Sequence, residues 1–83
     1  MIRVTHAEPR DDFYLVMDFT NGERRAFDMR PYLDIGVFKR LKNKQIFKQA
    51  KVAFGTVVWP GDLDIAPETL YIESVPIQGD SAI

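Results

Sequence analysis

The stretch FYLVMDFTNGERRAFD (residues 13–28) decides the fold of this chain. Its first seven residues place apolar side chains at every second position, which is the periodicity of a β-strand. Asn21-Gly22 follows, and this pair readily takes the two positive φ angles of a type I′ turn. A two-residue turn at this point predicts a β-hairpin whose register sets Val16 opposite Phe27.

In this register, both faces of the hairpin carry apolar side chains. The register also pairs the opposite charges of Asp18 and Arg25 across the two strands. One face bears Phe13, Leu15, Met17, Phe19 and Ala26, and the other bears Tyr14, Val16 and Phe27. A domain of 83 residues covers one such face well but rarely two. We therefore expect the face of Tyr14, Val16 and Phe27 to be an interface with a second chain.

Two further stretches predict strands. The alternation over residues 2–6 indicates a first strand before the hairpin. Residues 52–54 and 57–59 indicate a second hairpin, with Gly55-Thr56 as a type II′ turn between them.

The remaining segments predict short helices. Within residues 35–50, the apolar positions change helix face near Asn43, so we expect two short helices, with Asn43 capping the second. Asp28 and Asp34 are expected to cap the helical turns that follow them. Residues 66–71 predict one more helical turn.

These elements predict an α+β fold. A small antiparallel β-sheet of about five strands in two hairpins carries two or three short helices packed against it. We assign residues 1–75 to this single domain and residues 76–83 to a C-terminal tail. A hydrophobic content of 46% furnishes one core, and the 28% of charged residues with a net charge of −1 does not fit a disordered chain.

Composition also excludes several kinds of site and location. The chain has no cysteine, which excludes disulfides and thiolate zinc sites. No apolar run approaches the ~18 residues of a membrane span, and the charged N-terminal region does not fit a signal peptide. We therefore expect a cytoplasmic protein without membrane contact.

Catalytic chemistry finds little support among the polar residues. His6 is the only histidine, and Ser74 and Ser81 are the only serines, so a Ser-His-Asp triad or a multi-histidine metal site lacks partners. No Gly-rich phosphate loop is present, and no spacing forces two carboxylates into an acid/base pair. We expect no enzyme, no metal site and no cofactor.

Charge is distributed unevenly along the chain. Between Asp34 and Asp62 there are six basic residues and no acid: Lys39, Arg40, Lys42, Lys44, Lys48 and Lys51. Such a segment is a solvated face, a surface for an acidic partner, or a nucleic-acid surface. The pI of about 5.7 and the division of the lysines between two short helices favour the solvated face.

Trp59 lies close in sequence to Asp62 and Asp64. A tryptophan beside carboxylates is typical of a small-ligand pocket or of an interface anchor. The alternative, which we favour, is that Trp59 belongs to the core while one of the two aspartates bonds loop amides.

The residue pattern as a whole resembles that of a known family. Its most specific pieces are Asn21-Gly22 leading to Phe27-Asp28, and the stretch of Trp59 followed by residues 64–71, DIAPETLY. Over roughly residues 2–72, the chain is similar to the small bacterial proteins catalogued as domain of unknown function 2442. This resemblance implies a compact α+β domain, often encoded beside a second small uncharacterised family, number 4160. It also implies, for some members, a place in toxin–antitoxin-like pairs.

Two functions of different class follow. The first is a non-catalytic protein-interaction module that forms a homodimer and acts as the partner or antitoxin-like component of a two-gene system. The alternative is a nucleic-acid-associated regulator that uses the segment Lys39–Lys51, with nucleic acid the less favoured partner. A ligand-binding domain around Trp59 and Asp64 is a third, weaker hypothesis.

Overall fold

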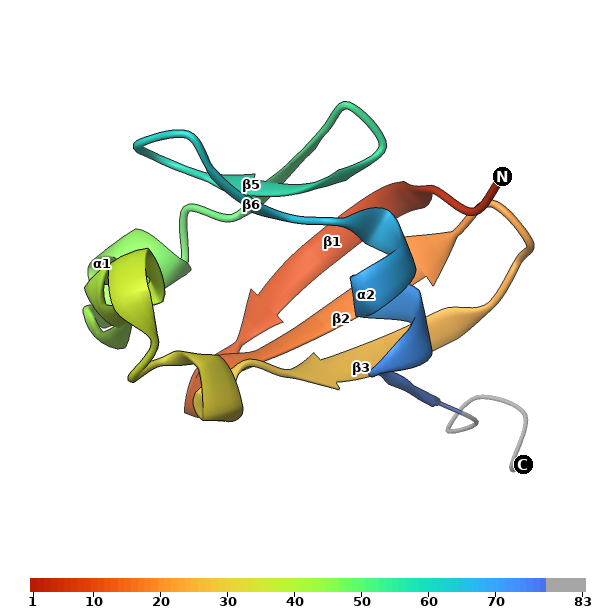
Figure 1. Ribbon diagram of the computed structural model, residues 1–83. Helices are drawn as coiled ribbons and strands as arrows, with labels where there is room; N and C mark the ends of the chain where they lie inside the picture. Colours follow the sequence, from red (N-terminus) through yellow and green to blue (C-terminus); the bar gives the residue numbers. More distant parts are fainter. Residues whose placement is uncertain (78–83) are drawn as a thin grey trace.

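A computed structural model describes residues 1–77 of the chain. Its short strands form two antiparallel sheets, and short helices connect them (Figure 1). Strands β1 to β7 span Val4–Arg10, Tyr14–Phe19, Arg24–Asp28, Lys51–Ala53, Thr56–Trp59, Leu63–Ile65 and Val75–Pro76. The 3-10 helices η1 to η3 span Asp11–Phe13, Arg30–Tyr32 and Gly36–Lys42. The α-helices α1 and α2 span Lys44–Phe47 and Pro67–Ile72.

Sheet A has the strand order β1-β2-β3-β7, and sheet B has the order β4-β5-β6. The α+β class and the antiparallel pairing predicted from the sequence are confirmed. The prediction of one sheet with about five strands is wrong, because the described residues form seven strands in two sheets. The strands missed, β6 and β7, have three and two residues, too few for a clear alternation.

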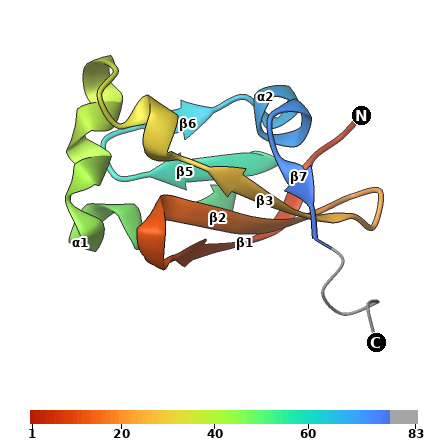
Figure 2. The ribbon, with the colours of Figure 1, turned by 90° about the horizontal axis from the view of Figure 1, so that it is seen from below.

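The core lies between the two sheets, and helices close it at both ends (Figure 2). Sheet A contributes Leu15, Met17, Phe19 and Phe27, while sheet B contributes Val57, Trp59, Leu63 and Ile65. Leu41 and Phe47, from η3 and α1, fill one end, and Leu70 of α2 fills the other. Most helical segments therefore pack at the ends of the sheets rather than across one open face.

The first hairpin differs from its predicted register by one residue. The Phe19 N–H donates to the Glu23 carbonyl at 2.9 Å, which closes a loop of three residues rather than two. Gly22 is the only residue of that loop with positive φ, at 88°, so the loop is not a type I′ turn. As a result Asp18 lies opposite Arg24, not opposite Arg25.

This shift moves Phe27 to the core face of the hairpin. Phe27 lies opposite Leu15 and is 1% exposed. It therefore does not share an outer face with Tyr14 and Val16, which lie opposite Asp28 and Ala26. The prediction that placed Phe27 on an exposed interface is wrong, because a one-residue slip turns every side chain of a strand to the opposite face.

The second hairpin turns at Phe54-Gly55, not at the predicted Gly55-Thr56. Ala53 pairs with Thr56, and the two residues between them have φ angles of 56° and 75°. Positive φ at both central positions defines a type I′ turn. Phe54 therefore belongs to the turn rather than to a strand.

Of the three predicted helix caps, only that of Asn43 is an N-cap in the structure, because η2 and η3 have Met29 and Ile35 as their N-cap residues. The Asn43 side chain accepts a hydrogen bond from the Gln45 N–H at 2.9 Å and begins α1. Asp28 accepts from the Arg30 N–H at 2.9 Å, ahead of η2. Asp34 does not cap η3; its carboxylate pairs with Lys42 at 2.6 Å instead.

The C-terminal part of the described chain returns to sheet A. Pro76 pairs with Arg25, and the Ile77 N–H donates to the Arg24 carbonyl at 2.9 Å. The expected start of the tail at residue 76 thus falls inside β7, and residues 78–83 of that tail lie outside the described residues.

The outermost strands of sheet A, β1 and β7, each contain a proline, Pro9 and Pro76. Proline has no N–H to offer a neighbouring strand and is typical of sheet edges.

None of the helices within residues 1–77 is long and apolar enough to cross a membrane.

Candidate interaction face

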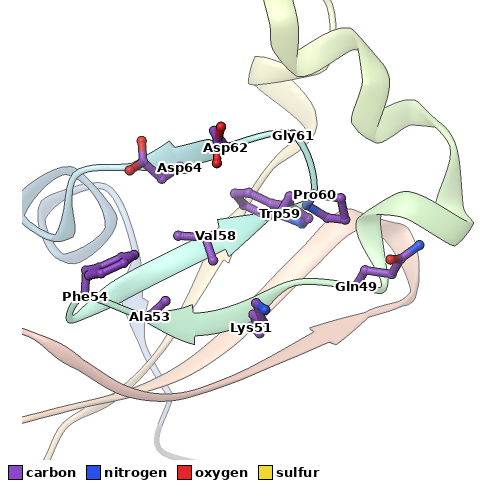
Figure 3. Close-up of a pocket in the computed structure, with 10 residues that line it drawn as sticks. All are labelled: Gln49, Lys51, Ala53, Phe54, Val58, Trp59, Pro60, Gly61, Asp62 and Asp64. Atoms are coloured by element: carbon purple, nitrogen blue, oxygen red, sulfur yellow. The ribbon is translucent and has the colours of Figure 1, made fainter.

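The side of sheet B that faces away from the core forms an open hollow of about 670 Å³ (Figure 3). We call this surface the outer B face. Lys51 and Ala53 reach it from β4, Val58 from β5 and Asp64 from β6. Phe54 stands at the β4–β5 turn, while Pro60 and Asp62 stand at the β5–β6 loop (Figure 3).

A row of three residues crosses the centre of the outer B face. Lys51 pairs with Val58, and Val58 pairs with Asp64, so the three side chains point to the same side. Directly paired residues lie about 5 Å apart in an antiparallel sheet. The face therefore carries a cation and an anion on opposite sides of an apolar centre.

Lys51 and Asp64 of this row, and Asp62 at the rim, have no ionic partner among the described residues. Five ion pairs occur within residues 1–77, and none involves Lys51, Asp62 or Asp64. All three residues are exposed. The outer B face thus offers both signs of charge to an incoming molecule.

Phe54 combines exposure with an unusual backbone conformation. Its φ is 56° and its side chain is 89% exposed. Among the ring contacts of the described residues, none involves Phe54. Phe13 also has positive φ, at 63°, but its ring packs edge-on against Phe47 with the centroids 5.3 Å apart. Internal packing therefore explains the conformation of Phe13 and not that of Phe54.

The three residues predicted to form a pocket do line one hollow, but they differ in character. Trp59 is 2% exposed, its indole N–H donates to the Phe47 carbonyl at 3.1 Å, and its ring stacks on Phe47. Asp62 and Asp64 are exposed at the rim. Trp59 is thus a core residue whose polar atom is already bonded.

Sequence reasoning missed Phe54, Lys51 and Val58 as members of this face. Phe54 was hidden because the turn was expected one residue later. The only sign of this turn in the sequence is the Phe54-Gly55 pair. It is recognised as the turn once Ala53 is known to pair with Thr56.

Four of the six basic residues are placed by their contacts. Lys42 is paired with Asp34, the Lys44 ammonium lies 6.0 Å from the ring centroid of Phe13, and Arg40 lies against Gly61. Lys51 belongs to the outer B face. These four cations therefore lie in different surroundings, and two of them, Arg40 and Lys51, lie near the β5–β6 segment.

The outer face of sheet A, which carries Tyr14 and Val16, also carries three ion pairs. Arg24 bonds Asp18 at 2.9 Å, Arg30 bonds Asp28 at 2.8 Å, and Arg10 bonds Glu8 at 3.1 Å. The hydrogen bond from Arg24 lowers the pKa of Asp18, and that from Arg30 lowers the pKa of Asp28. Val16 is half-buried beside Ala26.

Other polar groups of the described chain serve the fold. Tyr32 donates a hydrogen bond to Glu73, and this bond raises the pKa of Tyr32 to about 12. Within residues 1–77, no group of three or more potential metal ligands gathers, and no buried side-chain nitrogen or oxygen lacks a hydrogen-bond partner.

Comparison with known families gives one match, to the family described as protein of unknown function (DUF2442), over residues 4–76. Neither the curated proteins nor the solved structures give a match. The matched region includes all seven strands and both α-helices, and so the whole of the outer B face. The chain therefore belongs to the DUF2442 family.

Proposed function

We propose that this protein is a non-catalytic protein-interaction module that binds its partner through the outer B face. The setting expected from the sequence, a bacterial cytoplasmic protein acting as one component of a two-gene system, is part of this proposal. That setting is supported by resemblance, whereas the choice of surface is supported by geometry.

The main support for the proposal is the backbone conformation and the exposure of Phe54. A left-handed backbone conformation costs a non-glycine residue roughly 1–2 kcal/mol, and the cost is not offset here by burial of the ring. Asparagine at the same turn position would avoid most of this cost. An exposed aromatic side chain held in a strained conformation is explained if a partner buries it, because aromatic anchors dominate the energetics of protein interfaces.

The surroundings of Phe54 fit such an anchor. The hollow beside it has an apolar floor formed by Ala53 and Val58 and a charged rim with Lys51 and Asp64. An apolar centre with a polar rim is the usual composition of a protein interface. The other proposed surface, around Tyr14 and Val16, remains a prediction, although the charges near it already have partners.

The nucleic-acid alternative gains less support from the geometry. Binding to a phosphate backbone requires cations that act together along one surface. Here Lys42 is paired with Asp34, and Lys51 shares its face with Asp64. A protein partner suits this mixture of charges better.

The proposal predicts that Phe54→Asn separates stability from binding. We expect the variant to be as stable as the wild type or more stable by roughly 0.5–1 kcal/mol, because Asn-Gly is the preferred type I′ pair. We expect its association with other chains to weaken at least about tenfold through loss of the anchor. Urea unfolding measures the first effect. Light scattering of the chain alone, and calorimetric titration with the purified product of the adjacent gene, measure the second.

Ile72→Asn is the matched control, because Ile72 is 75% exposed and lies on α2, away from the outer B face. It should leave association unchanged. If Phe54→Asn binds both itself and the neighbouring product as tightly as the wild type, the proposal is wrong.

A further inference from the structure

We infer that the outer B face binds a second copy of this chain, in a two-fold dimer that packs one sheet B against the other. The inference rests on the proposed function and names the partner of the same surface. Its basis is the order of charges across the three strands.

The charges on this face are complementary to those of an identical face. Lys51 on β4 and Asp64 on β6 flank Val58 on the central strand, each as its direct cross-strand neighbour. The cation and the anion are therefore at similar distances from the middle of the face. No ion pair within residues 1–77 uses either charge.

The position of the two-fold axis follows from this arrangement. An axis between the sheets and parallel to β5 sets each Lys51 opposite the Asp64 of the second copy, and sets the two Val58 side chains together. An axis perpendicular to the strands would instead set Lys51 against Lys51, which is repulsive. The first axis also gives the strands of the two sheets nearly the same direction, with the sheets about 10 Å apart, as in other aligned sheet packings.

The same axis gives Phe54 a place in the dimer. Phe54 lies at the turn between β4 and β5, so the operation brings both copies of it to the same end of the interface. Each ring then faces the β5–β6 side of the other copy. Both rings then line the space between the two faces, each of which carries its own hollow of about 670 Å³.

Reciprocal charge reversal tests this arrangement. We expect the full-length chain to approach twice its mass of 9.6 kDa with rising concentration in light scattering. Lys51→Glu makes the central row of this face wholly anionic, and Asp64→Lys makes the same row wholly cationic. Because each pair occurs twice in a two-fold interface, either variant alone should dimerise at least about tenfold more weakly.

Mixing the two variants should restore association as a heterodimer, and the double variant K51E/D64K should again form a homodimer. Lys48→Glu and Asp11→Lys are the controls, since they make the same changes in charge at exposed positions outside this face. Both should dimerise as the wild type does.

Three results would overturn the inference: a monomeric wild type at high concentration, a Lys51→Glu dimer of unchanged affinity, or no heterodimer on mixing. These results differ from failure of the proposed function. A monomeric wild type that loses the adjacent gene product on Phe54→Asn would assign the face to that partner. If Phe54→Asn affects neither association, both the inference and the proposed function are wrong.

Discussion

Arg25 is the side chain that ties the C-terminal part of the described chain to the first hairpin. Its guanidinium lies 4.3 Å from the ring centroid of Tyr71 and donates to the Ser74 side chain at 2.7 Å and to the Ser74 carbonyl at 2.8 Å. It also bonds Glu23 at 2.6 Å, and the Tyr71 hydroxyl donates to the same carboxylate. One half-buried cation thus joins β3, the hairpin turn and the end of α2.

Arg25→Met tests this connection and keeps much of the aliphatic packing. The variant loses two hydrogen bonds to Ser74, the ion pair with Glu23 and the contact with Tyr71, so we expect its free energy of unfolding to fall by about 2 kcal/mol. Arg24→Met is the neighbouring control, whose exposed ion pair with Asp18 is worth less than about 1 kcal/mol. Equal losses in urea unfolding of the two variants would contradict this assignment.

The elements of this fold were predictable where a local rule decides them. Asn43 was identified as a cap because a break in helical periodicity coincides with a capping residue, and α2 begins with Pro67 as a first-turn proline does. The register of the first hairpin was not predictable from its turn. Asn-Gly favours a two-residue loop, but the three-residue loop buries Phe27, and burial of a phenylalanine contributes more than the preference between turns.

The same limit applies to the candidate site. Asp62, Asp64 and Trp59 were grouped because they are close in sequence, and all three line one hollow. Lys51 and Phe54 join them only through the pairing of β4 with β5, which sequence spacing does not reveal. Phe54 is also the residue that local preferences would place elsewhere, since aromatic residues favour strands over left-handed turns.

The outer face of sheet A predicts a dependence of stability on acid. Hydrogen bonds from Arg24 and Arg30 hold the pKa values of Asp18 and Asp28 below that of an unfolded aspartate. The folded chain therefore binds fewer protons, so this contribution is complete above about pH 4 and is lost as the pH falls toward the lower, folded pKa values. Urea midpoints should fall steadily below about pH 4.

Asp28→Asn tests how much of this dependence of stability on acid comes from Asp28. Asparagine retains an oxygen for the Arg30 N–H but carries no charge for the guanidinium. We expect the variant to be less stable than the wild type at neutral pH and to lose less on acidification. An unchanged slope of stability against pH would show that Asp28 does not contribute.

The molecule as a whole has one core shared by two sheets. Leu15 of sheet A and Ile65 of sheet B belong to the same buried cluster as Trp59. The amide of Val4 donates to the Gly55 carbonyl at 2.8 Å, which joins β1 to the second hairpin. We therefore expect the two sheets to unfold together.

Leu15→Ala and Ile65→Ala test this cooperativity. Each should lower the free energy of unfolding by about 2–5 kcal/mol, as other truncations of buried aliphatic side chains do. In both variants, Trp59 fluorescence and far-UV circular dichroism should report the same midpoint. A fluorescence transition that precedes the loss of ellipticity in Ile65→Ala would show that sheet B unfolds alone.

The prolines at the margins of sheet A have a consequence for how the protein meets other chains. Small β-rich proteins grow into fibrils when an exposed strand accepts another strand through its backbone, and almost any sequence can supply that backbone. Pro9 and Pro76 interrupt the row of N–H groups on the two sides where such growth would begin. Recognition of other chains then depends on side chains, which distinguish one neighbouring protein from another in the cell.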